Sequence, residues 1–183
     1  TGTCCMPYFV DVCQQRSNEV SEFIALDKDV LHKSYINFLR QGMKGWFEAM
    51  TDKPIVFSKH RVWSQFFPHT FEIDPNSKYL VILRDLRDII CSFESLLWKY
   101  PQVTNENMHQ ESFEKRMEMY CTDEGSTLGR PLQMLPHLME VTQKSPNSFF
   151  LCRHEDFNRE PRETMQQIYQ WLGEENFEHD FDN

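Results

Sequence analysis

The chain has 183 residues, of which 40% are hydrophobic and 26% are charged, and its formal net charge is −9 at pH 7. This length and composition predict a single domain over residues 1–183 that can bury a substantial core. The negative charge excludes the broad basic surface of a nucleic-acid-binding protein. No run of about 18 apolar residues exists, so we expect no membrane-spanning helix.

The first predicted helix follows directly after Thr1-Gly2-Thr3-Cys4-Cys5, where apolar residues recur at helical spacing. Hydroxyl-bearing residues around a glycine at a helix N-terminus suit an anion, because backbone amides and the helix dipole favour negative charge there. An ordinary helix N-cap has the same composition. The pattern therefore indicates an anion site only in combination with other features.

The next segments predict a helix and a short strand. Residues 17–33 are expected to form a loop or a short helix, and apolar spacing over 35–50 predicts a longer helix. An apolar strand is predicted over 54–58, and it ends in the basic run 59–61. Basic side chains at the end of a strand indicate the ligand edge of a sheet. Residues 64–78 are expected to be a turn-rich connection.

The most informative stretch runs from Lys78 to Phe93. Tyr79–Leu83 is a continuous apolar run, which predicts a parallel strand covered on both faces. Arg84 follows at the carboxyl end of this strand, and Ser92 lies on the helix expected to continue to about residue 99. An arginine and a hydroxyl above a parallel sheet can hold a phosphate or another oxyanion. In the turn between them, Arg87 and Asp88 are expected to form a structural pair.

The remaining elements alternate between helix and strand. Two helices, a strand and a final helix are predicted over 112–121, 131–143, 149–152 and from Pro161 to Gly173. Alternating strands and helices predict an α/β domain with a parallel sheet. The six cysteines show neither a CxxC pair nor metal-ligand spacing. They predict a cytoplasmic protein with reduced thiols and no metal.

Four segments, in the same order, resemble the superfamily of sulfotransferases that use 3′-phosphoadenosine 5′-phosphosulfate (PAPS). They are Thr1-Gly2-Thr3, 57–63, 84–92 and 153–157, and the closing run 177–181 resembles bacterial and phage-type members. The resemblance implies a P-loop-type three-layer sandwich, with a central parallel sheet flanked by helices. It also implies that the family's first strand, with its basic residue, and the C-terminal cofactor segment are missing from this sequence.

The resemblance assigns cofactor contacts residue by residue. Arg84 and Ser92 would hold the 3′-phosphate of PAPS. His154 stands where many members have an aromatic residue near the adenine, and a stacking role and a structural role are equally open. The carboxylates of Glu155 and Asp156 are expected to make structural hydrogen bonds. The 5′-phosphate and sulfonate would be held by Thr1, Gly2, Thr3 and Cys4.

The resemblance places catalysis at Lys59 and His60. Cytosolic steroid and phenol sulfotransferases carry a catalytic His in the corresponding segment, whereas other branches, including the tyrosylprotein enzymes, have a Lys nearby. His60 is the natural proton acceptor, because an imidazole has an ordinary pKa of about 6.5. Lys59 could instead contact the sulfonate, or it could be a solvated lysine.

The predicted function is transfer of a sulfuryl group from PAPS to a hydroxyl or amine, leaving adenosine 3′,5′-bisphosphate, without a metal. The acceptor would be a small molecule or a glycan, and the oligomeric state stays open. One alternative is a P-loop small-molecule kinase, although the sequence has no complete Walker A motif. A non-catalytic nucleotide-binding domain is the other.

Overall fold

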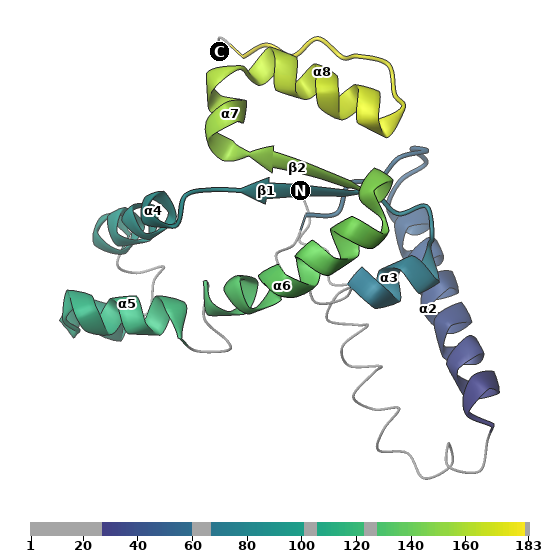
Figure 1. Ribbon diagram of the computed structural model, residues 1–183, viewed down its shortest axis with the longest axis horizontal. Helices are drawn as coiled ribbons and strands as arrows, with labels where there is room; N and C mark the ends of the chain where they lie inside the picture. The colour runs from purple at the N-terminus through teal and green to yellow at the C-terminus, as the bar shows by residue number, and fades with distance from the viewer. Residues whose placement is uncertain (1–26, 60–66, 101–105, 123–127, 182–183) are drawn as a thin grey trace. The chain divides into compact units, whose positions relative to one another are not determined.

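The computed structural model describes residues 27–59, 67–100, 106–122 and 128–181 (Figure 1). The chain divides into two units, residues 1–77 and 78–183. The predicted N-terminal loop and first helix lie outside the described residues, as does His60.

Two helices, α2 (Lys28–Met50) and α3 (Phe67–Ile73), make up the regular structure described for the first unit. They pack through Ile36 and Leu39 of α2 and Ile73 of α3, which are buried together. The Nε atom of Arg40 donates to the carbonyl oxygen of Ile73 at 2.7 Å. This bond satisfies an acceptor at the C-terminal end of α3 that has no partner within the helix.

Helix α2 begins seven residues before the predicted start at Tyr35. The side chain of Asp27 caps it, because its Oδ1 accepts hydrogen bonds from the amides of Asp29 and Val30 at 3.0 and 3.1 Å. A capped start satisfies amide donors that would otherwise lack a partner. The prediction of a helix is therefore confirmed, and its predicted N-terminal boundary is wrong.

The strand predicted over 54–58 is wrong, because these residues form no strand in the structure. Their apolar side chains are exposed, and that of Phe57 is 71% exposed. A short apolar run becomes a strand only where a neighbouring strand pairs with it, and its composition cannot show whether such a neighbour exists. The predicted connection over 64–78 likewise contains α3.

The second unit contains two strands, β1 (Tyr79–Leu83) and β2 (Phe149–Arg153). They pair in parallel, with Tyr79 opposite Phe149 and Leu83 opposite Arg153. Both predicted strands are confirmed, and so is the parallel α/β arrangement. The described residues hold a sheet of two strands, and the three-layer sandwich stays a prediction.

Burial alternates along β1, contrary to the expectation that both faces are covered. Tyr79, Val81 and Leu83 are partly buried, whereas Leu80 and Ile82 are 40% and 55% exposed. Successive side chains of a strand point to opposite faces, so one face is better covered than the other. A continuous apolar run therefore did not predict the burial of both faces.

Helices follow each strand. Four predicted helices are confirmed within a few residues, and they are α4 (Leu86–Lys99), α5 (Phe113–Cys121), α6 (Gly129–Lys144) and α8 (Pro161–Leu172). Three shorter elements were not predicted, namely the 3₁₀ helices η3 (Glu106–Gln110) and η4 (Pro146–Ser148) and the helix α7 (His154–Arg159). Each is too short for the helical period to appear in the sequence.

The final helix packs back onto the sheet. Figure 1 shows α7 and α8 turning back along β2, and the rings of Phe150 and Trp171 lie 5.6 Å apart. The Nζ atom of Lys78 donates to the carbonyl oxygens of Trp171 and Leu172 at 2.6 and 2.9 Å. The amino end of β1 is thereby fixed to the C-terminal end of α8.

Candidate functional site

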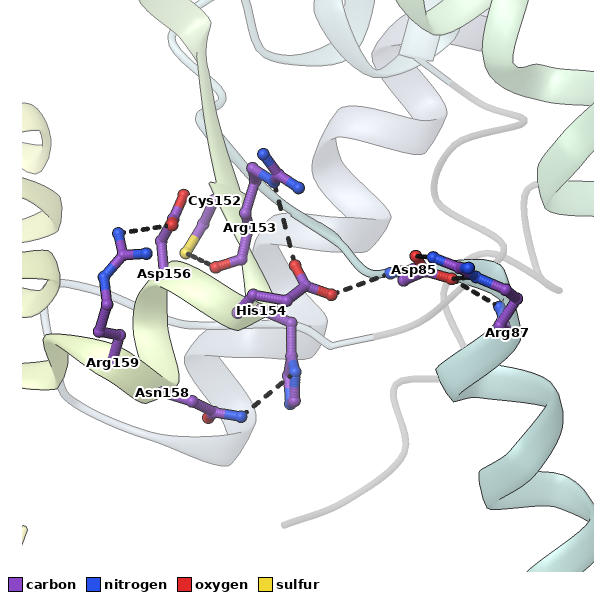
Figure 2. Close-up of polar contacts among 9 residues, drawn as sticks. Asp85, Arg87, Cys152, Arg153, His154, Asp156, Asn158 and Arg159 are labelled. Atoms are coloured by element: carbon purple, nitrogen blue, oxygen red, sulfur yellow. Dashed lines mark hydrogen bonds and ion pairs between the residues drawn. The ribbon is translucent and has the colours of Figure 1, made fainter.

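The carboxyl ends of β1 and β2 lie side by side. Leu83 is opposite Arg153 in the parallel register, so Arg84 and His154 are the next residues on the two strands. Open α/β sheets bind ligands at this edge. Figure 2 shows that Asp85 and His154 leave the sheet at the same edge.

Two arginines at this edge present exposed guanidinium groups. The side chain of Arg84 is exposed, and none of the salt bridges among the described residues involves it. Arg153 is 70% exposed, and its Nε lies 4.0 Å from an Oε atom of Glu155. A guanidinium group carries a permanent charge and donors in a planar fork, which matches phosphate and sulfonate oxygens.

The turn after Arg84 is held by Asp85, the N-cap residue of α4. Its Oδ1 accepts from the amide of Arg87 at 2.8 Å, and its Oδ2 accepts from the Arg87 guanidinium, also at 2.8 Å. The side-chain hydrogen bond with Arg87, with the backbone bond second, lowers the pKa of Asp85 to about 2. The expected pairing of Arg87 with Asp88 is wrong, since the ion pair of Arg87 is with Asp85.

Glu155 joins the ends of the two strands. Its Oε1 accepts from the backbone amide of Asp85 at 3.0 Å, across 70 positions of sequence. This hydrogen bond is the main cause that lowers the pKa of Glu155. Asp156 instead pairs with Arg159 at 2.8 Å. The expectation that both carboxylates make structural hydrogen bonds is confirmed.

His154 is the first residue of α7 and is partly buried. Its Nδ1 lies 3.4 Å from Nδ2 of Asn158, one helical turn further along (Figure 2). This long contact leaves both roles that the sequence suggested for His154 open. The residue nonetheless stands at the ligand edge, next to the strand that carries Arg153.

Ser92 lies on α4 and is partly buried. It follows the N-cap Asp85 by seven positions, which is close to two helical turns, so the two residues share one face of the helix. The rise along the helix axis between them is about 10 Å. An extended arginine side chain from the turn and a ligand phosphate can together cover such a span.

The other residues predicted for the site are placed less completely. Lys59 is exposed in an irregular segment of the first unit. His60 and the four loop residues Thr1, Gly2, Thr3 and Cys4 lie outside the described residues. Within the part of the chain that the structure describes, no cluster of His, Cys, Asp and Glu could hold a metal ion. None of the helices described there is long and apolar enough to cross a membrane.

Sequence reasoning missed a nearly buried polar network that joins α4 to α5. Arg116 is 6% exposed, and its guanidinium binds the carboxylate of Glu94, with Nη2–Oε2 at 2.6 Å. The hydroxyl of Tyr120 donates to Oε1 of Glu94 at 3.2 Å. The one available signal was Arg116 between Phe113 and Tyr120, on what would otherwise be an apolar stripe of the helix. This network holds in place the helix that carries Ser92.

Comparison with known proteins gives one family. The family model described as "Sulfotransferase domain" matches residues 1–182. No curated protein and no solved structure matches the chain. The family match spans both units and includes the ligand edge of the sheet.

Proposed function

This chain belongs to the sulfotransferase domain family, and we propose that it transfers a sulfuryl group from PAPS to a hydroxyl or amine of a small-molecule or glycan acceptor. The observation that supports this most is Arg84, whose exposed guanidinium stands at the carboxyl end of β1 without a salt bridge to any described residue. A phosphate group is the natural partner of such a side chain at this edge.

In this proposal Arg84 and Ser92 bind the 3′-phosphate of the donor, which distinguishes PAPS from nucleotides that lack this group. The amides and hydroxyls of Thr1, Gly2, Thr3 and Cys4 bind the 5′-phosphate and the sulfonate. His154 lies beside the adenine. The support for these roles is the position of Arg84 and His154 at one sheet edge and of Ser92 on the helix that follows.

The proposed chemistry is an in-line transfer, in which an acceptor oxygen or nitrogen forms a bond to sulfur as the bond from sulfur to the 5′-phosphate oxygen breaks. His60 takes the proton from the attacking group. Lys59 stabilises the negative charge on the transferred group. The products are the sulfated acceptor and adenosine 3′,5′-bisphosphate.

Isothermal titration of the full chain tests the donor assignment without an acceptor. Adenosine 3′,5′-bisphosphate should bind roughly ten- to a hundredfold more tightly than 5′-AMP, since a hydrogen bond to a charged group contributes about 1.5–3 kcal/mol. ATP with Mg²⁺ serves as the comparison for a kinase and should bind more weakly than the bisphosphate. Equal affinity for the bisphosphate and 5′-AMP would contradict the proposal.

A further inference from the structure

The turn that carries Arg84 is fixed from a distant part of the chain. The amide of Asp85, the residue after Arg84, donates to Oε1 of Glu155 at 3.0 Å, and this contact is partly buried. Glu155 belongs to the first turn of α7, directly after β2. One carboxylate therefore joins the ends of both strands at the ligand edge (Figure 2).

The backbone of Arg84 is constrained on both sides. Before it, Leu83 is held in the parallel register with Arg153. After it, the backbone of Asp85 is held by Glu155, and the side chain of Asp85 is held by Arg87. Arg84 itself has no salt bridge among the described residues, so its direction is set by the backbone on either side.

We propose that Glu155 is a positioning residue for Arg84, and that it fixes the turn so that the guanidinium is directed toward the 3′-phosphate of the nucleotide. The inference rests on the proposed function. A side chain held in its binding orientation before the ligand arrives loses less conformational freedom on binding, and the complex is correspondingly tighter. Without the bond from Glu155, the turn has to be ordered at the moment of binding.

Electrostatics alone predicts the opposite effect. Glu155 carries a negative charge beside a site for an anion, so removing it should strengthen phosphate binding. Its nearest cation is the exposed Arg153, at 4.0 Å, which offsets this charge only in part. The two accounts therefore differ in sign for a variant without the carboxylate, and a binding measurement can separate them.

The experiment uses the full chain and measures the preference for adenosine 3′,5′-bisphosphate over 5′-AMP by titration calorimetry. Glu155→Ala should lower this preference roughly three- to tenfold, the range of a typical hydrogen bond. Glu155→Gln should keep it near the wild-type value, because its amide oxygen can accept the same bond from Asp85. The matched control is Asp156→Ala, which removes an acid from the same helical turn that pairs with Arg159, and it should leave the preference unchanged.

A fourth variant separates charge from reach. Glu155→Asp keeps the negative charge but shortens the side chain by one methylene, so it should lose the preference as Glu155→Ala does. It also replaces Glu155→Ala if thermal melting shows that the alanine variant does not fold. An unchanged or increased preference in the alanine and aspartate variants, or a glutamine variant as weak as alanine, would overturn the assignment.

The wild-type titration distinguishes the two levels of the argument. If the wild-type protein shows no preference for the bisphosphate, the 3′-phosphate assignment fails and the role of Glu155 fails with it. If the preference is present and insensitive to Glu155, the proposed donor stands and only the positioning role is wrong.

Discussion

The guanidinium of Arg116 binds the carboxylate of Glu94 through two nitrogens, with Nη2–Oε2 at 2.6 Å and Nε–Oε1 at 2.9 Å. The two side chains are only 7% and 16% exposed. Because α4 and α5 meet at this pair, it bears directly on the stability of the helix that carries Ser92. A nearly buried pair is costly to break from one side, since the remaining charge has no partner.

We expect Glu94→Ala to lower the free energy of unfolding by about 3 kcal/mol, because Arg116 would keep its charge in a nearly buried position. The matched control is Glu118→Ala, which breaks an exposed pair with Lys115 on the same helix as Arg116 and should have little effect. Urea denaturation of each variant measures the difference. Similar destabilisation by the two substitutions would contradict the prediction.

Stability should fall as the pH falls below about 4.5. Hydrogen bonds with Arg87, Arg116 and the Asp85 amide lower the pKa values of Asp85, Glu94 and Glu155 respectively, and that of Asp85 falls to about 2. On acidification the unfolded chain therefore binds protons before the folded chain does, which favours unfolding. The contribution of these groups is complete above their ordinary values, 3.8 for Asp and 4.5 for Glu, and is lost as the pH falls through the lower folded-state values.

Urea denaturation between pH 7 and pH 2 checks this dependence. The free energy of unfolding should change little from pH 7 to pH 5 and then decrease steadily. Glu94→Gln should weaken the decrease, because this position no longer titrates. Stability that stays constant or rises below pH 4.5 would show that these carboxylates are not held as the structure describes.

The parts of the fold that could be predicted from sequence depend on local signals. Tyr79–Leu83 is a short apolar run between Lys78 and Arg84, and it forms the predicted strand. The final helix ends before Gly173, whose φ of 82° lies in the left-handed region that glycine adopts easily. Such signals act over a few residues and do not require knowledge of the tertiary structure.

The features that sequence could not predict depend on distant partners. The carboxylate of Glu155 finds the Asp85 amide across 70 positions, and no local pattern specifies that contact. The run 54–58 has the composition of a strand without pairing as one in the structure. For the site, the sequence predicted that Arg84 and His154 lie at ends of strands, and the parallel register then confirmed that those ends are adjacent.

The role of Arg84 can be tested by comparing two substitutions. Arg84→Ala should remove most of the preference for adenosine 3′,5′-bisphosphate over 5′-AMP. Arg84→Lys should restore only part of it, because an ammonium group keeps the charge but lacks the planar fork. The control is Arg159→Ala, which removes the same charge from the exposed surface of α7. If this control loses as much preference as Arg84→Ala, the effect comes from net charge and not from a specific contact.

The choice of base rests on the relative effects of His60 and Lys59. His60→Ala should lower the rate of the transfer step by roughly 10²–10⁴, the usual contribution of general acid–base catalysis, with nucleotide affinity nearly unchanged. Lys59→Ala should instead weaken the stabilisation of charge on the transferred group, and PAPS binding with it. Lys53→Ala, which removes another exposed lysine of the first unit, is the control for net charge.

Single-turnover transfer from labelled PAPS measures both effects, with an acceptor selected from a panel of phenols, amines and glycans. Near wild-type transfer by His60→Ala, together with loss of transfer by Lys59→Ala, would move the chemistry to the lysine. A proton acceptor with an ordinary pKa near 6.5 should also make the transfer rate rise as the pH increases through that value, because only the neutral imidazole accepts a proton. The pH–rate profile of the wild-type protein therefore gives a second test of His60 that needs no substitution.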